Sequence, residues 1–250
     1  MIESNRPERI GVVLAAGLGL RLASCAKASP AKPLTSIGGV PLLVRTLRSL
    51  EVAGCRQAVI VVGHRAPLVR RAIGQLYRGP LRLHFAHNKA YELQNGLSVL
   101  CARPFVGEEF VLTMADHLLD DAILERVARA EVPPGGAALC VDFKIDSVFD
   151  LDDATKVRAK DGRIEAIGKQ LKDYNCIDCG VFLCTPSLMD AIEEVARQRG
   201  DASLSEGVAR LARRGLMGII DIGDARWQDV DTPEMLREAE SSFGRRASGT

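Results

Sequence analysis

Glycines and basic side chains near the N-terminus form a pattern that suits the binding of a polyphosphate. Gly17 and Gly19 follow a short apolar run, and Arg21 comes two residues later. Glycine lets backbone N–H groups approach phosphate oxygens without a Cβ in the way. The guanidinium of Arg21 offers a fork of donors for such oxygens, and Lys32 adds a compact positive charge further along the segment. These residue types predict a loop that holds a triphosphate.

Other glycine-rich loops account for this segment less well. A dinucleotide fingerprint needs a third glycine where Leu22 stands, and an acidic residue after the second strand, which here ends in Gly63 and His64. A P-loop needs the pattern GxxxxGK followed by Ser or Thr, and the chain lacks it. A loop without any ligand stays open, but it would leave the charges of Arg21 and Lys32 unexplained.

An acid ends an apolar run near the middle of the chain. Asp116 follows the run 111–115 and is a candidate ligand for Mg2+, which prefers one or two carboxylates with phosphate oxygens and water. Helix capping is the alternative for Asp116. His117 comes next, either as a general base or as a packing residue. A phosphate acceptor would need no base, because its second pKa of about 6 leaves it mostly a dianion at neutral pH.

The hydrophobic pattern predicts the scaffold that positions these side chains. Short apolar runs alternate with segments of helical spacing in the first half. We expect strands at 9–16, 57–63, 81–86 and 110–115, and helices at 41–53, 67–76, 95–101 and 120–130. This alternation predicts an α/β fold with right-handed crossovers and a mostly parallel sheet. Ligands bind beyond the carboxyl ends of such strands, so the loops after the four strands should share one rim. Those loops follow Ala16, Gly63, Ala86 and Ala115.

The second half has a different texture and predicts a small β-hairpin and lid region. We expect strands at 137–143, 177–184 and 216–222, a hairpin of 155–159 with 163–167, and helices at 186–198 and 233–242. We find no internal repeat and no low-complexity linker, so residues 1–250 are predicted to form a single domain. Its parts are a nucleotide-binding half at 1–135, an acceptor-binding half at 136–243 and a frayed tail at 244–250.

The overall composition argues against several classes of protein. The chain has 33 Lys and Arg against 32 Asp and Glu, which argues against a nucleic-acid binder. No apolar run reaches the about 18 residues of a membrane helix, and the charged residues 1–9 do not form a secretion signal. We therefore expect a cytoplasmic protein without membrane insertion, whose seven cysteines are reduced.

Two of these cysteines, Cys176 and Cys179, form a CxxC. The pair could be half of a zinc site, a redox pair or two small core residues. No second CxxC exists to complete a metal site, and positions i and i+3 of a strand point to opposite faces. We therefore favour core packing.

Residues 14–34 resemble the signature of the sugar-phosphate nucleotidyltransferase family. That signature is a strand, the pattern AAGxGxR, a variable gap and Lys-Pro-Leu; the family usually has proline immediately before the lysine, whereas here Ala31 intervenes. The resemblance implies the nucleotide-diphospho-sugar transferase fold, a Rossmann-like three-layer sandwich. It also implies that Arg21 and Lys32 are catalytic residues that bind triphosphate oxygens. The implied nucleotide contacts in this segment are Leu14, Ala15, Ala16, Gly17 and Gly19.

A later motif extends the resemblance to the metal. Residues 227–233 resemble the family's W-x-D motif, which implies Asp229 as a ligand of Mg2+ beside Asp116. Asp231 and the two residues after it look like a helix start. We therefore prefer Asp229 to Asp231 as the second ligand.

Motifs across most of the chain narrow the resemblance to the CTP:inositol-1-phosphate cytidylyltransferases. They lie at 88–98, 114–117, 149–157 and 177–180. The further nucleotide contacts that this implies are Asn88, Asn95, Gly96, Ser98 and Ala115. Amide and hydroxyl groups can read a base, although Asn95 would also suit a helix N-cap. Cys179 departs from the alanine or threonine that is common in the family.

The same resemblance implies contacts to the acceptor. Lys169 matches a family lysine that grips the acceptor phosphate, and a solvated surface lysine is the alternative. Asp178 and Lys156 are the other acceptor contacts that we expect. Asp152 and Asp153 would shape the same pocket or form a solvated turn.

Taken together, the resemblance implies a magnesium-dependent enzyme that transfers CMP from CTP to inositol 1-phosphate, giving CDP-inositol and pyrophosphate. The alternatives are the same chemistry on phosphocholine or a phosphonate, transfer from UTP or GTP to a hexose 1-phosphate, and a non-catalytic nucleotide-binding module. The missing ribose acid argues against a nicotinamide oxidoreductase. The product would pass to a separate CDP-alcohol transferase, and the sequence leaves open whether the chain forms a homodimer.

Overall fold

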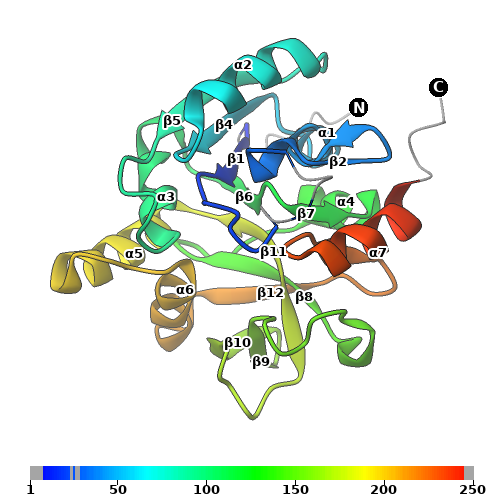
Figure 1. Cartoon of the computed structure of the whole chain (residues 1–250). Helices are drawn as coiled ribbons and strands as arrows, with labels where there is room; N and C mark the ends of the chain where they lie inside the picture. The colour runs from blue at the N-terminus through cyan, green and yellow to red at the C-terminus, as the bar shows by residue number, and fades with distance from the viewer. Residues whose placement is uncertain (1–7, 23–24, 26–28, 245–250) are drawn as a thin grey trace, which may run out of the picture.

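The computed structural model describes residues 8–22, 25 and 29–244, and these are organised around a central sheet (Figure 1). Within the described residues this sheet has nine strands in the order β5-β4-β1-β6-β11-β8-β12-β10-β9. The strands are β1 (Ile10–Ala15), β4 (Gln57–Val62), β5 (Arg82–His87), β6 (Phe110–Met114), β8 (Ala137–Asp142), β9 (Lys156–Lys160), β10 (Arg163–Gly168), β11 (Cys176–Cys184) and β12 (Met217–Asp221). Two small sheets pair β2 (Ser36–Ile37) with β3 (Val40–Pro41), and β7 (His117–Leu119) with β13 (Trp227–Asp229).

Helices cover both faces of the sheet, and alternate residues of each strand face the two layers. The helices are α1 (Leu42–Val52), α2 (Ala66–Leu76), α3 (Gly96–Cys101), α4 (Asp121–Arg129), α5 (Pro186–Arg199), α6 (Leu204–Arg213) and α7 (Pro233–Phe243). Val12 and Leu14 pack in one core with α3, α5 and α6. Val13 and Ala15 pack in the other core with α1, α2 and α4. The α/β three-layer sandwich expected from the sequence is therefore confirmed.

The four strands of the first half are parallel, and their carboxyl ends meet at one rim. β1 lies between β4 and β6, and β4 pairs with β5, all in parallel register. Parallel strands are buried on both faces, which is why these segments read as continuous apolar runs. Backbone bonds from His64 and Ala115 to the end of β1 tie the rim loops together.

The sheet as a whole is mixed and not mostly parallel as expected, because its second half contains antiparallel strands. β11 runs antiparallel to both β6 and β8, and β9 and β10 form the expected hairpin. Parallel neighbours need a long crossover, whereas β9, β10 and β11 follow one another through short connections that permit antiparallel pairing. β11 thereby joins the two halves through its pairing with β6 and β8.

One helix and two pairs of short strands were absent from the sequence prediction. The helix is α6, whose N-cap is Ser203; the Ser203 hydroxyl accepts from the backbone N–H of Glu206, while the Glu206 carboxylate accepts from the Ser203 N–H. This capping box stabilises the first turn of the helix. The strand pairs are β2–β3 and β7–β13, since strands of two or three residues are too short for a periodic signal.

A small third core packs against the end of the glycine loop, residues 17–22. Leu22, which follows Arg21 in that loop, is almost fully buried against Leu118 of β7, Val230 after β13, and α7. This packing holds the loop beside the strands that carry the candidate metal ligands.

The division into halves at 135 and 136 stays a prediction, and the predicted frayed tail falls mainly on residues 245–250, outside the described residues. No helix in the described part of the chain has both the length and the apolar content needed to cross a membrane.

Candidate active site

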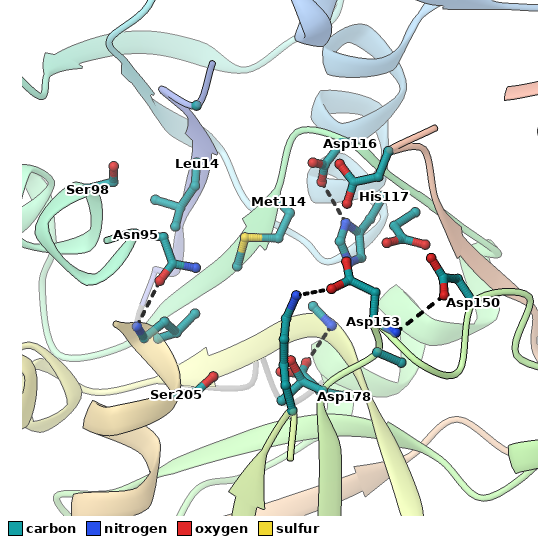
Figure 2. A pocket seen from close by; sticks show the side chains of 18 of the residues that line it. Leu14, Asn95, Ser98, Met114, Asp116, His117, Asp150, Asp153, Asp178 and Ser205 are labelled. Atoms are coloured by element: carbon teal, nitrogen blue, oxygen red, sulfur yellow. Dashed lines mark hydrogen bonds and ion pairs between the residues drawn. The ribbon is translucent and has the colours of Figure 1, made fainter. Parts of the chain in front are cut away.

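A cavity of about 350 Å³ lies at the carboxyl rim of the sheet and receives side chains from both halves of the chain. Figure 2 shows Leu14, Asn95 and Ser98 on one side of this space, with Asp116, His117 and Asp153 on the other. A second hollow of about 360 Å³ lies beside it and is lined by the glycine loop, Lys32 and two acids. The residues predicted to face the triphosphate are therefore neighbours in space.

The glycine loop lies directly against Lys32. Gly19 has a φ of +64°, and a Cβ placed on it would lie 2.7 Å from the Cβ of Lys32. Glycine is required here both for the left-handed backbone and for the close approach. Leu22 donates a backbone hydrogen bond to the carbonyl of Gly19, which closes the turn that presents Arg21 to the cavity.

Basic and acidic side chains alternate across the rim. Lys32 Nζ contacts Asp116 Oδ2 at 2.5 Å and also contacts Asp231 Oδ1. Arg21 donates to Asp231 at 2.7 Å and to Asp153 at 2.8 Å. Lys169 Nζ lies 2.5 Å from the other oxygen of Asp153. Three basic residues from distant segments thus share one set of carboxylates.

This pairing sets the charge state of the network. Burial opposes the charge of Lys32, but Asp116 and Asp231 outweigh it and raise the pKa of the ammonium. Burial likewise opposes the charge of Asp116, yet Lys32 and His117 hold the pKa of that carboxyl well below its usual range. Lys169 and Arg21 overcome burial and lower the pKa of Asp153. Lys32, Asp116 and Asp153 are therefore charged at neutral pH.

Asp231 has a different role from the one expected. The expected helix start at 231–233 is confirmed, because α7 begins at Pro233 and its N-cap is Thr232, whose hydroxyl accepts from the Met235 backbone N–H. The carboxylate of Asp231 does not cap this helix and instead accepts from Arg21 and Lys32. Side-chain direction at the end of β13 decides this, and residue type alone could not reveal it.

Asp229 is brought to Asp116 by the small β7–β13 sheet. Asp229 is the register partner of His117, and Val230 donates a backbone bond to the carbonyl of Asp116. Burial, with the negative charges of Asp231 and Asp116, raises the pKa of Asp229 despite the opposing effect of His117. An acid whose charge is disfavoured in this way would gain from a nearby cation.

The donor set fits magnesium. Asp116 and Asp229 offer carboxylate oxygens, and each such oxygen has two lone pairs, so the contacts to Lys32 and His117 leave further acceptor capacity. Among the described residues, no group of three or more His, Cys, Asp or Glu side chains forms a metal cage. Mg2+ is commonly bound through one or two carboxylates and substrate phosphates rather than by such a cage.

His117 contacts Asp116 through a ring nitrogen and stacks on an aromatic ring. Its Nδ1 lies 2.7 Å from Asp116 Oδ1, and its ring stacks on Trp227 with centroids 5.9 Å apart. Burial lowers the pKa of His117, but Asp116 more than compensates and raises it. Asp116 does not cap α4, because that helix begins after Asp120.

On the nucleotide side, Asn88 supports the site and does not line the cavity. Asn88 is buried, and its Nδ2 donates to Ser98 Oγ at 2.9 Å while its Oδ1 accepts from the Ala90 backbone N–H. Ser98 and Asn95 do line the cavity. Asn95 makes no capping bond to its own helix; its Oδ1 instead accepts from the Leu204 backbone N–H at the start of α6.

The other expected nucleotide contacts also include residues that line a cavity and one that does not. Leu14, Ala16 and Gly17 line the main cavity, and Ala15 and Ala115 line the hollow beside it. Gly96 lines neither. A Cβ placed on it would lie 2.4 Å from the Ala202 carbonyl, so this glycine serves the packing of α3 against the segment before α6.

On the acceptor side, Asp178 and Lys169 line the cavity but Lys156 does not. Lys156 is buried, and its Nζ donates to the backbone carbonyl of Asp152 at 2.8 Å. It therefore holds the turn that carries Asp153, and its side chain does not face the cavity where the acceptor contact was expected. Burial raises the pKa of Asp178 to about 6, although its Oδ1 accepts from the Gly180 backbone N–H.

Several lining residues were not expected from the sequence. Ser205 lines the cavity from the start of α6. The capping-box pattern of Ser203 and Glu206 was the signal that could have revealed this helix. Asp150 and Trp227 also line the cavity. The CxxC plays no part in it, because Cys176 and Cys179 are fully buried in opposite cores and burial raises the pKa of Cys176 to about 12.

Comparison with known proteins places this geometry among nucleotide-using enzymes. Residues 11–213 match the family described as MobA-like NTP transferase domain. The chain is 36% identical over 242 residues to the bifunctional IPC transferase and DIPP synthase of Rubrobacter xylanophilus, covering 95% of this chain and 52% of that protein. It is 32% identical to the CMP-5'-(3-aminopropyl)phosphonate synthase of Streptomyces rubellomurinus, covering 93% of this chain and 38% of that protein. The chain thus spans about half the length, or less, of these relatives.

A solved structure matches nearly the whole fold. The inositol-1-phosphate CTP transferase from T. maritima superposes with a TM-score of 0.78 at 28% identity, over 94% of this chain and 97% of that one. At 94% of this chain, the match extends over both halves.

Asp178 should make stability depend on pH in a defined direction. Its folded pKa of about 6 lies above the ordinary value of 3.8, so the folded protein binds the proton more tightly and stability falls as the pH rises between these values. Asp178→Asn removes this cost. We expect its free energy of unfolding to exceed that of wild type by roughly 1–3 kcal/mol at pH 8 and by much less at pH 4. Urea unfolding at both pH values measures this, and an equal difference at both would contradict the assignment.

Gly180→Ala should displace His117. Gly180 has a φ of +71°, and a Cβ there would lie 2.5 Å from Cδ2 and Nε2 of His117. We expect the stacked ring to move, which should change the fluorescence of Trp227, the one tryptophan of the chain. Gly162→Ala is the matched control, because Gly162 has a similar φ of +75° with open space around it. Equal emission spectra for the wild type and Gly180→Ala would show that the contact is relieved without moving His117.

Proposed function

The chain belongs to the family of MobA-like NTP transferase domains, and we propose that it transfers CMP from CTP to inositol 1-phosphate, releasing CDP-inositol and pyrophosphate. The observation that carries this proposal is the meeting of Arg21, Lys32 and Lys169 with Asp116 and Asp229 around two adjoining cavities. Positive groups suit the phosphates of two substrates, and paired carboxylates suit a divalent cation.

In the proposed reaction, an oxygen of the acceptor phosphate attacks the α-phosphorus of CTP. The bond from the α-phosphorus to the bridging oxygen of the β-phosphate breaks, and pyrophosphate leaves with that electron pair. The acceptor is already a dianion at neutral pH, so no side chain has to remove a proton. The work of the protein is to align two anions and offset their mutual repulsion.

Lys32, Arg21 and the amides of the glycine loop would bind the triphosphate, and Lys169 would bind the acceptor phosphate. Arg21 and Lys169 share Asp153, so a single carboxylate orients a triphosphate-binding and an acceptor-binding cation. We place Mg2+ on Asp116 and Asp229. When bound, the ion supplies positive charge that offsets the charge of the triphosphate and orients it.

The acceptor side favours a molecule rich in hydroxyl groups. Asp150, Asp178 and Thr155 line it, and ionised carboxylates accept hydrogen bonds from hydroxyls. A trimethylammonium group would instead want a cage of aromatic rings. Among the described residues, the lining includes only Tyr91 and Trp227 of the Phe, Tyr and Trp side chains. This supports inositol 1-phosphate over phosphocholine.

The similarity to the inositol-1-phosphate CTP transferase supports the same choice, since it covers 97% of that chain. The phosphonate synthase of Streptomyces keeps a phosphonate acceptor as the second candidate. The structures titled as a putative glucose-1-phosphate thymidylyltransferase and a UDP-glucose pyrophosphorylase are 19% and 15% identical, so they support the fold alone. A cytoplasmic location, a homodimer and a separate enzyme that consumes CDP-inositol stay predictions.

A pyrophosphate-release screen tests the proposal. CTP, UTP, GTP and ATP are each offered with inositol 1-phosphate, phosphocholine, 3-aminopropylphosphonate and glucose 1-phosphate, with and without Mg2+. We expect CTP with inositol 1-phosphate to give the strongest signal, and only with Mg2+. A stronger signal from UTP or GTP with glucose 1-phosphate would contradict the proposal.

The same assay includes two variants. Asp116→Asn should lower turnover by about two to three orders of magnitude, because it removes a charge that faces the reacting phosphates. Asp190→Asn, at an exposed carboxylate paired with Arg103, is the control and should leave turnover unchanged. Turnover of Asp116→Asn at the wild-type rate would overturn the metal assignment.

A further inference from the structure

A buried carboxylate lies behind the active site and takes no part in the proposed chemistry. Asp142 is the last residue of β8, and its side chain is 3% exposed. Its Oδ1 accepts from the backbone N–H of Lys144 at 2.8 Å and from Lys144 Nζ at 2.7 Å. Its Oδ2 accepts from Nε1 of Trp227 at 3.0 Å. Burying a carboxylate is costly unless each oxygen is paired, and here one oxygen is committed to the indole.

Trp227 connects this carboxylate to the catalytic cavity. The indole lies between two cavities and lines both, the second being a hollow of about 400 Å³ that Asp142 also lines. One edge of the ring donates to Asp142, while one face stacks on His117 with an interplanar angle of 17°. An indole whose N–H is held by a fixed acceptor keeps one orientation, so the face it offers to His117 is fixed as well.

His117 connects the fixed indole to the carboxylate of Asp116. The imidazole Nδ1 lies 2.7 Å from Asp116 Oδ1, and Lys32 holds the other oxygen. The chain of contacts therefore runs from β8 in the second half of the molecule to the carboxylate at the end of β6 in the first half. Backbone pairing of β7 with β13 keeps the two rings on neighbouring strands, with Trp227 opposite Leu119 and His117 opposite Asp229.

We propose that Asp142 is a positioning residue for this active site and acts on Asp116 through the indole N–H of Trp227 and the ring of His117. The inference rests on the proposed function, in which Asp116 faces the reacting phosphates. When a residue that orients the ligands of a catalytic centre is removed, metal affinity or activity commonly falls by about 10- to 100-fold.

The first test separates positioning from general stability. Asp142→Ala should lower kcat by about 10- to 100-fold with a smaller change in the KM for the acceptor. Asp142→Asn keeps an oxygen for the indole and should recover part of that loss. Glu109→Ala is the matched control, because Glu109 is a half-buried carboxylate that pairs with the buried Arg9 at the other end of β1. It should lower stability but leave kcat unchanged.

The second test asks whether the effect passes through the indole N–H. Trp227→Phe keeps an aromatic ring that can stack on His117 and removes the N–H donor together with one of the two fused rings of the indole. If Asp142 acts through that donor, adding Asp142→Ala to Trp227→Phe should lower kcat by no more than about twofold further. Full additivity of the two substitutions, or a folded Asp142→Ala with wild-type kcat, would overturn the inference.

A third readout does not depend on the identity of the substrates. Trp227 is the one tryptophan of the chain, so its emission reports on the Asp142 contact in the protein alone. We expect a shifted emission maximum in Asp142→Ala and none in Glu109→Ala. We also expect Asp142→Ala to weaken the Mg2+-dependent response of this emission to CTP. If the screen failed for every substrate pair, the proposed function would fall, and these spectra would still decide the inference: unchanged emission in Asp142→Ala would overturn it.

Discussion

The structure depends on the neutralisation of acidic side chains that converge on one rim. Asp116, Asp229 and Asp231 come together there from two strand ends. Burial opposes the charge of Asp116 and Asp229, and the negative charges of Asp231 and Asp116 add to this effect at Asp229. Lys32 contacts both Asp116 and Asp231, and its positive charge favours the ionised form of Asp116. Removal of Lys32 would leave uncompensated charge, which is more costly than the loss of one ion pair.

The fold meets this constraint by combining a long sheet with very short elements. The parallel strands β1 and β6 deliver the glycine loop and Asp116 to the same edge. The β7–β13 pair then adds Asp229 and Asp231, and Leu22, Leu118 and Val230 pack beneath to hold the loop in place. β11 links the halves, so Asp178 and Asp116, which we propose as contacts of the acceptor and of the metal, are parts of one continuous scaffold.

The residues that the sequence could identify are those whose role follows from their position at a strand end. Gly19, Arg21 and Asp116 belong to this group, because apolar strands and the turns after them leave clear patterns. Lys32 lies further along the chain and was predicted from its charge. Lys156 and Asn88 were assigned to ligands, but their side chains turn inward to a backbone carbonyl and to Ser98. Asp231 was assigned to a helix start and points to the loop instead. Residue type and spacing do not reveal side-chain direction, and the three-residue strands of the rim leave no periodic signal.

A crystal structure of the chain with CTP and Mg2+ tests the central claim most directly. Our account predicts the β- and γ-phosphates against Gly17 to Arg21, with Lys32 and Arg21 on their oxygens and the ion held by Asp116 and Asp229. Because Lys32 and Arg21 pair with Asp231 in the structure described above, their contacts should shift toward the phosphates in the complex. A triphosphate bound away from the glycine loop, or an ion held by neither carboxylate, would contradict the account.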